Sequence, residues 1–223
     1  MSYSLRLRLL DLKALLRMRR DVFRDIYRYN LWGGGESRSG QGSTLQSTVS
    51  VRAQLPGIIR RFGIRTMLDA PCGDFHWMSR VPLGLDLYIG GDIVPEVIES
   101  NRRLYDTDSG RRRFRVLDIT RNPIPKVDLI FCRHCMIHVP LAEAQRCLNN
   151  FRRSGSTYLM ATTVPDCKLN RDIRSGGFRP LNLQLAPFLL PEPLAQIHDA
   201  VIIEGRSQGD GWLYMWKLND PRD

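Results

Sequence analysis

The stretch that decides the fold reads Met67-Leu68-Asp69-Ala70-Pro71-Cys72-Gly73-Asp74-Phe75. It starts as a short apolar strand that ends in a carboxylate, and it then turns sharply through Pro71 and Gly73. Residues 75–81, which follow the turn, are expected to begin a helix. A strand, a tight turn and a helix let the backbone approach a polar ligand closely, and the start of the helix offers unpaired N–H groups.

Two later carboxylates repeat this placement. Asp92 ends an expected strand over 87–93, and Asp118 falls at the end of another over 114–119. An acid about 20 residues past the first turn is placed to accept hydrogen bonds from both ribose hydroxyls of a nucleoside. Because ligands of parallel sheets sit outside the carboxyl ends of the strands, we expect these acids and the loop 133–138 to line one site.

Strands and helices alternate along most of the chain. This alternation predicts an α/β, Rossmann-like fold with a mostly parallel seven-stranded sheet and helices on both faces. The arginine triplet 111–113 is expected to be a solvated loop, and 164–193 a long excursion from the sheet. The expected helices cover 48–62, 95–105 and 141–151, and the remaining expected strands cover 127–132, 156–163, 200–204 and 212–218.

The first 46 residues differ in character from residues 47–223, which are expected to form the main domain. Residues 4–29 predict a basic amphipathic helix, because apolar residues recur at three-to-four spacing and arginines fall mostly on the other side. Packing of the apolar stripe on the domain or on a second subunit is favoured over binding to a membrane surface or a partner.

Residues 30–44 are rich in glycine and hydroxyl side chains. A flexible Gly/Ser linker has no need of Trp32, Glu36 or Arg38, so we expect a lid that orders over bound ligand. Glu36, Ser37 and Arg38 supply this lid with an anion, a hydroxyl and a cation, which can pair with charged groups of a ligand.

Composition narrows the class of protein. The 223 residues suit one domain, and the net charge of +10 comes almost entirely from arginine. That excess fits either an anionic partner or a solvated arginine-rich surface. The five cysteines are odd in number, and Cys132-x-x-Cys135 has no second pair, so neither a disulfide framework nor a metal site is expected. No apolar run is long enough to span a membrane, and a cytoplasmic protein is expected.

Several motifs together resemble the class I S-adenosylmethionine-dependent methyltransferases over 48–218. Pro71 and Phe75 stand where the first motif of that family has glycines, so only Gly73 matches strictly. The stretches that carry the resemblance are "LDAPCGDFHW" (68–77) for the first motif, "YIGGDI" (88–93) for the second, "VLDI" (116–119) for the third and "VDLIFCRHCMIHV" (127–139) for the turn towards substrate.

The resemblance implies S-adenosyl-L-methionine as cofactor and S-adenosyl-L-homocysteine as product. Asp92 would hold the ribose, and Asp118 with Ile119 would contact the adenine. The full set of implied cofactor-binding residues is Ser37, Arg38, Asp69, Ala70, Pro71, Gly73, Asp74, Trp77, Asp92, Ile93, Asp118, Ile119 and Arg133.

The combination of these motifs with residues 32–45 and 175–193 looks like a bacterial and viral subgroup linked to surface-polysaccharide synthesis. It implies O-methylation of a sugar in a glycan, nucleotide-sugar or glycolipid precursor. Four residues are expected to wall the acceptor site: Trp32, Glu36, Phe178 and Arg179. A stable nucleic-acid complex is not expected. Association with a membrane or a glycosyltransferase through the N-terminal helix, and a homodimer, stay open as alternatives.

A hydroxyl must lose its proton as the methyl group arrives, which calls for an imidazole or a carboxylate close by. His138 is favoured as the general base and His134 is its rival, with a pKa near ~6.5 if unperturbed. Two other functions stay open. An RNA or protein methyltransferase suits the charge, although Cys132-Arg133-His134-Cys135 replaces the usual amine-methylation motif. A non-catalytic binding subunit of the same fold suits the altered first motif.

Overall fold

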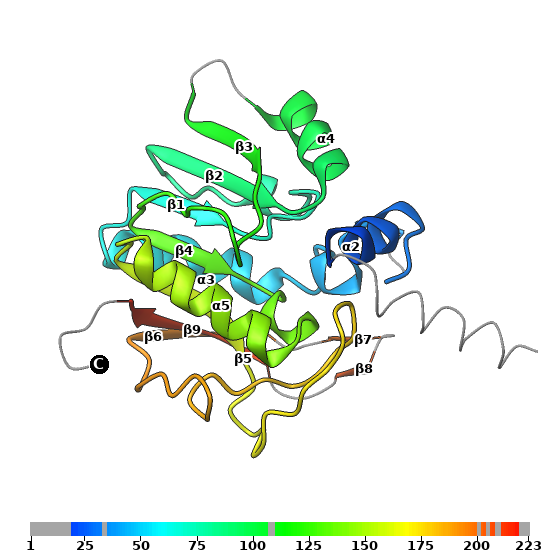
Figure 1. The fold of residues 1–223 in the computed structure, drawn as a ribbon. Helices are drawn as coiled ribbons and strands as arrows, with labels where there is room; N and C mark the ends of the chain where they lie inside the picture. The colour runs from blue at the N-terminus through cyan, green and yellow to red at the C-terminus, as the bar shows by residue number, and fades with distance from the viewer. Residues whose placement is uncertain are drawn as a thin grey trace, which may run out of the picture.

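The computed structural model describes residues 19–32, 35–106, 110–199, 202–203, 206–207 and 211–218. One seven-stranded sheet forms the centre, in the order β3-β2-β1-β4-β5-β9-β6 (Figure 1). Strands β1 to β5 pair in parallel, whereas β9 runs antiparallel to both β5 and β6. The expected α/β fold is confirmed. The strands are β1 (Thr66–Asp69), β2 (Leu87–Asp92), β3 (Arg112–Val116), β4 (Leu129–Cys132), β5 (Tyr158–Thr163), β6 (Ala195–His198) and β9 (Trp212–Lys217).

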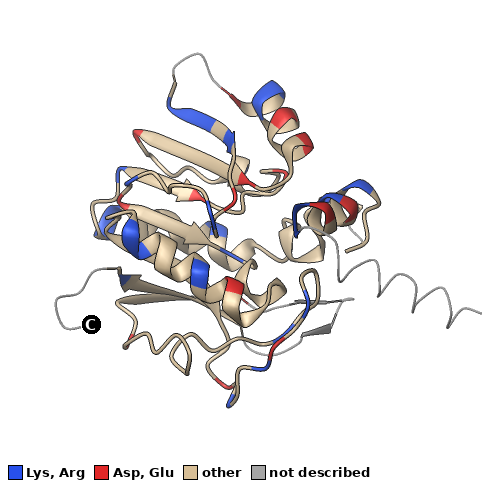
Figure 2. Ribbon diagram, viewed as in Figure 1, with Lys and Arg blue, Asp and Glu red and all other residues tan. Residues whose placement is uncertain are grey.

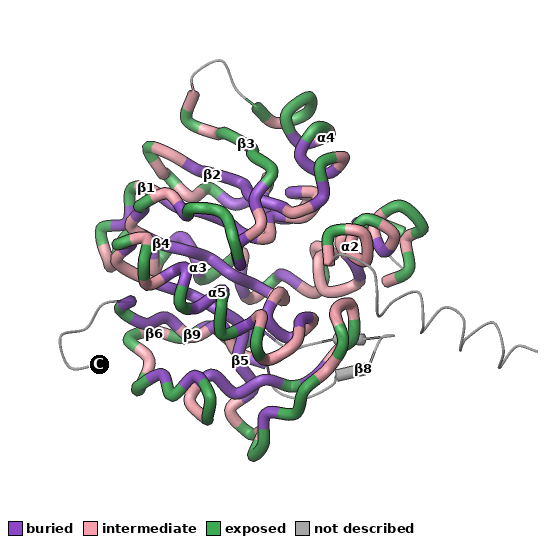
Figure 3. Tube along the Cα trace, in the orientation of Figure 1, coloured by how far each residue is buried: buried purple, intermediate pink, exposed green. Residues whose placement is uncertain are grey.

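Alternate residues of the central strands enter two apolar cores, one on each face of the sheet. Met67 and Leu129 pack with helix α3 (Val49–Arg61) and with part of α4 (Pro95–Tyr105). Their neighbours along the strands, such as Leu68, pack with α5 (Leu141–Arg153) on the other face. Burial on both faces explains why these strands are apolar throughout, and Figure 3 shows buried chain running through the middle of the sheet.

The carboxyl ends of the parallel strands carry the predicted acids. Asp69 and Asp92 are the last residues of β1 and β2. β3 stops at Val116, so Asp118 lies two residues into the following loop. β4 leads into a loop and a short 3-10 helix, η3 (Met136–His138), that precedes α5. The sequence placed these groups at one edge of the sheet, and the structure confirms it.

The edge strand β3 corrects one prediction. Arg112 and Arg113, expected in a solvated loop, belong to this strand and pair with Tyr88 and Ile89 of β2. Phe114 is its buried residue, and the arginines around it are half-buried or exposed. Charged side chains on an edge strand disfavour pairing with a second chain. These arginines therefore belong to a strand and are also in contact with solvent.

Two other elements also differ from expectation. The helix expected over 75–81 is only a single 3-10 turn, η2 (Met78–Arg80). The strand expected over 200–204 is replaced in the sheet by β6, because Ile197 enters the core beside Leu213 of β9. Ile202 and Ile203 (β7) pair instead with Arg206–Ser207 (β8) in a separate two-stranded ribbon.

Helix α2 (Arg19–Arg28) is the described part of the predicted N-terminal helix, and the rest of 4–29 lies outside the described residues. Its apolar side faces the domain, with Ile26 buried and Phe23 packed against the core under α5. Basic residues are spread over α2, β3 and α5 (Figure 2). Among the described helices, none is long and apolar enough to cross a bilayer.

Candidate active site

A cavity opens at the carboxyl edge of the sheet, under α2 and the segment 36–45. Its floor comes from the ends of β1, β2, β3 and β4, and its cover comes from the N-terminal part of the chain. Most predicted site residues line it, and they are Trp32, Arg38, Asp69, Pro71, Gly73, Asp74, Trp77, Asp92, Ile93, Asp118, Ile119, Arg133, His134 and His138.

Asp69 closes the floor of the cavity. The hydroxyl of Tyr88 donates a 2.6 Å hydrogen bond to its carboxylate. Burial raises the pKa of Asp69 to about 7, while Tyr88 and the nearby Arg133 oppose that rise. At neutral pH the group is therefore balanced between its charged and neutral forms.

Asp92 fixes the turn between β1 and η2. Its carboxylate accepts hydrogen bonds from the backbone N–H of Gly73 (3.2 Å) and of Val94 (2.9 Å). Burial raises its pKa to about 6 even though these N–H groups favour the charged form. Gly73 has φ 52°, a left-handed conformation that favours glycine. The acid at the end of β2 thus holds the backbone turn that follows β1.

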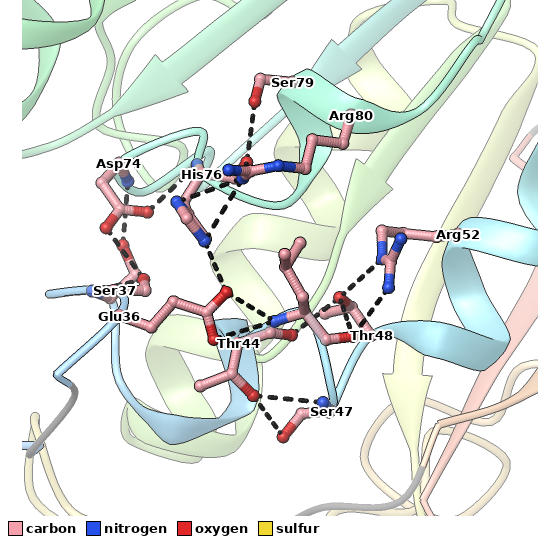
Figure 4. Close-up of polar contacts among 12 residues, drawn as sticks. Glu36, Ser37, Thr44, Ser47, Thr48, Arg52, Asp74, His76, Ser79 and Arg80 are labelled. Atoms are coloured by element: carbon pink, nitrogen blue, oxygen red, sulfur yellow. Dashed lines mark hydrogen bonds and ion pairs between the residues drawn. The ribbon is translucent and has the colours of Figure 1, made fainter.

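The segment 36–45 is held onto this turn by polar contacts (Figure 4). Asp74 accepts hydrogen bonds from Ser37 Oγ (2.8 Å) and from the backbone N–H of Arg38 (3.0 Å). In return, the N–H of Asp74 donates to Ser39 Oγ at 2.9 Å. A Cβ atom at Gly73 would collide with the Ser39 side chain, so the glycine permits this close approach.

Glu36 supports the segment from outside the cavity. Its carboxylate lies 2.7 Å from His76 Nε2 and accepts the backbone N–H of Leu45 (Figure 4). Glu36 and Ser37 were predicted to contact substrate and cofactor respectively. In the structure neither lines the cavity, and both hold the segment through hydrogen bonds to other parts of the chain. Ala70 also lies behind the lining, where its N–H pairs with the carbonyl of Phe131.

His138 has a defined tautomer. Its Nδ1 lies 2.7 Å from the carbonyl oxygen of Gly177, which only accepts, so Nδ1 carries the proton and Nε2 keeps a lone pair. The ring packs against Trp32, with centroids 4.6 Å apart, and against Phe178 at 6.0 Å. Burial lowers the pKa of His138 to about 4. The value of ~6.5 that an unperturbed imidazole would have therefore does not apply to the pKa of His138.

His134 belongs to a different cluster, built around Asp199. Arg133 donates two hydrogen bonds of 2.8 Å to the Asp199 carboxylate, and His134 Nε2 lies 3.4 Å from it. Burial opposes ionisation of Asp199, but Arg133 and His134 prevail and hold its pKa well below the usual range. The Arg133 guanidinium also lies over the Trp77 ring, 5.3 Å from its centroid.

The acceptor wall is only partly as predicted. Trp32 lines the cavity. Phe178 does not line it but packs against the ring of His138, which does. Arg179 was predicted as an acceptor contact, but it does not line the cavity. Its buried guanidinium donates to the carbonyl oxygens of Met136 and Val139, and so supports the backbone of η3.

Arg19 and Asp199 were missed by the sequence analysis. Arg19 reaches from α2 into the cavity wall and pairs with Asp118 and Glu143. The contacts of Arg19 and Asp199 join residues that are about 66 to 124 positions apart in the sequence. A local sequence pattern therefore does not predict them. The described residues contain no cluster of three or more His, Cys, Asp or Glu side chains arranged to hold a metal ion.

Solved structures share this fold at low sequence identity. Magnesium protoporphyrin IX methyltransferase from Synechocystis PCC 6803 with bound SAH has a TM-score of 0.58 and 15% identity, over 89% of this chain and 97% of that one. The methyltransferase domain of bacterial CtHen1-C has a TM-score of 0.57 and 11% identity, over 79% and 100%. No protein-family model matches the chain, and no curated protein matches it either. The chain thus has the fold of class I methyltransferases.

Proposed function

We propose that the chain binds S-adenosylmethionine and transfers its methyl group to a hydroxyl of a sugar in a glycan or glycolipid precursor. One observation carries the proposal. Asp69, Asp92 and Asp118 follow three adjacent parallel strands and line one cavity, in a fold shared with methyltransferases crystallised with SAM or SAH.

The residues of the cavity fit such a cofactor. Asp92 offers carboxylate oxygens at the end of β2, where ribose hydroxyls bind in nucleotide-binding sheets. The turn at Gly73 brings backbone close to the same point. Apolar side chains beside these groups suit the flat faces of a base. They are Val94, Val97, Leu117 and Ile119.

S-adenosylmethionine supplies an electrophilic methyl group on a sulfonium, so the protein need only align an oxygen and accept its proton. His138 suits the second task. Its Nε2 lone pair belongs to a ring that lines the cavity, and its low pKa keeps the imidazole neutral at physiological pH. The Gly177 carbonyl fixes the ring through Nδ1 and stabilises the imidazolium that forms.

The acceptor side supports a sugar through its aromatic groups. Trp32 and Phe178 flank His138, and aromatic faces pack well against the C–H groups of a sugar ring. Arg38 is exposed at the rim of the cavity, where its guanidinium suits the carboxylate at the methionine end of the cofactor.

The test is transfer of labelled methyl from S-adenosylmethionine to a panel of deoxysugar glycans, RNA and proteins. The proposal expects label in the glycans, released by glycosidase treatment. Label in RNA or protein alone would show that the proposed acceptor is wrong and that the chain is still a methyltransferase. Cofactor binding without transfer to any class would favour a binding subunit, and no binding would overturn the proposal.

A further inference from the structure

Arg19, in α2, lines the proposed cofactor cavity. Its side chain is 11% exposed, and it bridges two carboxylates, Asp118 after β3 and Glu143 in α5. It also donates to Thr120 Oγ1 at 2.6 Å, while the contact with Glu143 is 2.7 Å. One guanidinium thus ties the N-terminal helix to two elements of the domain.

The contacts single out one oxygen of Asp118. Arg19, the N–H of Thr120 and the hydroxyl of Thr120 all donate to Oδ1. Within the described residues, every hydrogen bond to this carboxylate ends on that atom. Oδ2 is therefore the oxygen left for a donor in the cavity that Asp118 lines.

The surroundings of Asp118 define what that donor is. The cavity beside it is walled by apolar side chains from the ends of β2 and β3 and from α4, and these suit the faces of a flat base. An exocyclic amino group at the edge of the base would donate to Oδ2. An oxo group at the same place would set oxygen against oxygen and leave Oδ2 without a donor.

We propose that Arg19 is a positioning residue for adenine recognition: it locks the Asp118 carboxylate so that Oδ2 faces the 6-amino group of the cofactor. The inference rests on the proposed function, since it needs the cofactor in this cavity. Arg19 acts through Asp118. Its planar fork suits this role, because it bridges two carboxylates in one fixed geometry.

A pair of ligands tests the proposal without any turnover. S-adenosylhomocysteine carries the 6-amino group, and S-inosylhomocysteine carries a 6-oxo group in its place. Calorimetry on the full chain measures both affinities for wild type and for Arg19→Met. We expect Arg19→Met to bind the adenine ligand on the order of tenfold to a hundredfold more weakly. Its preference for adenine over hypoxanthine should fall by about fivefold or more.

Arg24→Met is the matched control. Arg24 also anchors α2, through an ion pair with Glu96, but its side chain is 46% exposed and does not line the cavity. This variant should keep both affinities within about twofold, because exposed ion pairs contribute little. Arg19→Lys keeps the charge without the fork, and it gives a milder form of the same test if Arg19→Met does not fold.

The outcomes separate the two hypotheses. If Arg19→Met weakens both ligands equally, Arg19 merely tethers α2, and the proposal is wrong. Unchanged or tighter binding of S-adenosylhomocysteine would also overturn it, the latter by showing that Arg19 blocks the site. A wild-type chain that binds neither ligand would overturn the proposed function, and this inference with it.

Discussion

The two sides of the cavity are built by different means. On one side, Asp69 and Asp92 end strands of the sheet and are held by the Tyr88 hydroxyl and by backbone N–H groups. On the other side, Trp32 and His138 come from irregular segments that meet only in the tertiary structure. The first side is therefore fixed by the sheet, and the second depends on how loops pack.

This difference separates features that the fold provides from features that belong to this chain. Strand ends place acids in the same way in any sheet of this topology, so they indicate a cofactor class. In the proposed function, the loops would carry the contacts that choose an acceptor, as loops on rigid scaffolds commonly do. Changes on the sheet side should thus affect cofactor affinity, and changes on the loop side should affect the rate of transfer.

The largest expected effect is on the loop side. His138→Ala should lower the single-turnover rate of methyl transfer at saturating cofactor by about 10²–10⁴-fold, the usual contribution of a general base. His134→Ala should cost less, because Nε2 of His134 faces Asp199. If both variants transfer methyl at the wild-type rate, neither imidazole is the base.

The pH profile of the same reaction sharpens this prediction. A base is active in its unprotonated form, and the pKa of His138 lies at about 4. The wild-type rate should therefore stay flat from about pH 6 to 8 and fall only towards pH ~4. A rate that instead rises through pH ~6.5 would point to an imidazole with an unperturbed pKa.

The next effect belongs to the sheet side. Asp92→Ala should weaken cofactor binding several-fold to hundreds-fold, because hydrogen bonds to a carboxylate contribute about 1.5–3 kcal/mol each. Asp86→Ala is the matched control, since Asp86 lies before β2 at the opposite edge and pairs with exposed Arg65. If calorimetry finds the same cofactor affinity for Asp92→Ala and Asp86→Ala, Asp92 does not contact the cofactor.

A smaller effect is expected where the two sides meet. A Cβ atom at Gly42 would lie 2.8 Å from His134 Nδ1, so either the segment 36–45 or the His134 ring must shift in Gly42→Ala. Overpacking of this kind costs about 1–3 kcal/mol, which should weaken cofactor binding several-fold or more. Gly35→Ala serves as control, because nothing lies within 4 Å of its added Cβ. Equal affinities for the two variants would show that this contact does not hold the segment in place.

The smallest predicted effect concerns stability. The folded pKa of Asp69, about 7, lies above the ~3.9 of an unfolded chain. The folded state thus binds the proton more tightly, and the contribution of Asp69 to stability falls as pH rises from about 4 to 7. Asp69→Asn removes this titration. When pH is raised from 5 to 7.5, the Tm of the variant should therefore rise by a few degrees relative to the Tm of wild type. Parallel Tm curves for the two proteins would contradict the raised pKa.

The sheet side could be predicted from sequence because its signals are local. Asp69 and Asp92 follow apolar runs directly, and the order of strands and helices sets where those runs end. Asp118 was also found, although its strand stops two residues earlier than expected. Such positions depend on periodicity and turn residues, which a single sequence displays.

Contacts between segments that are far apart in the sequence could not be predicted in the same way. Asp199 and Arg19 act through partners far along the chain, so no spacing in the sequence reports them. Arg179 was expected at the wall of the acceptor site, yet its guanidinium is buried and donates to backbone carbonyls. The low pKa of His138 is likewise a consequence of packing, which residue type alone does not reveal.

Hydrogen exchange with and without S-adenosylhomocysteine tests the central claim most directly: that a cofactor binds at the carboxyl edge of the sheet beneath the N-terminal segment. Binding should slow exchange in residues 36–45, 71–75 and 92–94, which face or cover the cavity. Residues 82–86, at the opposite edge, should exchange equally in both states. Equal exchange everywhere at saturating ligand, or protection confined to the opposite edge, would contradict the account.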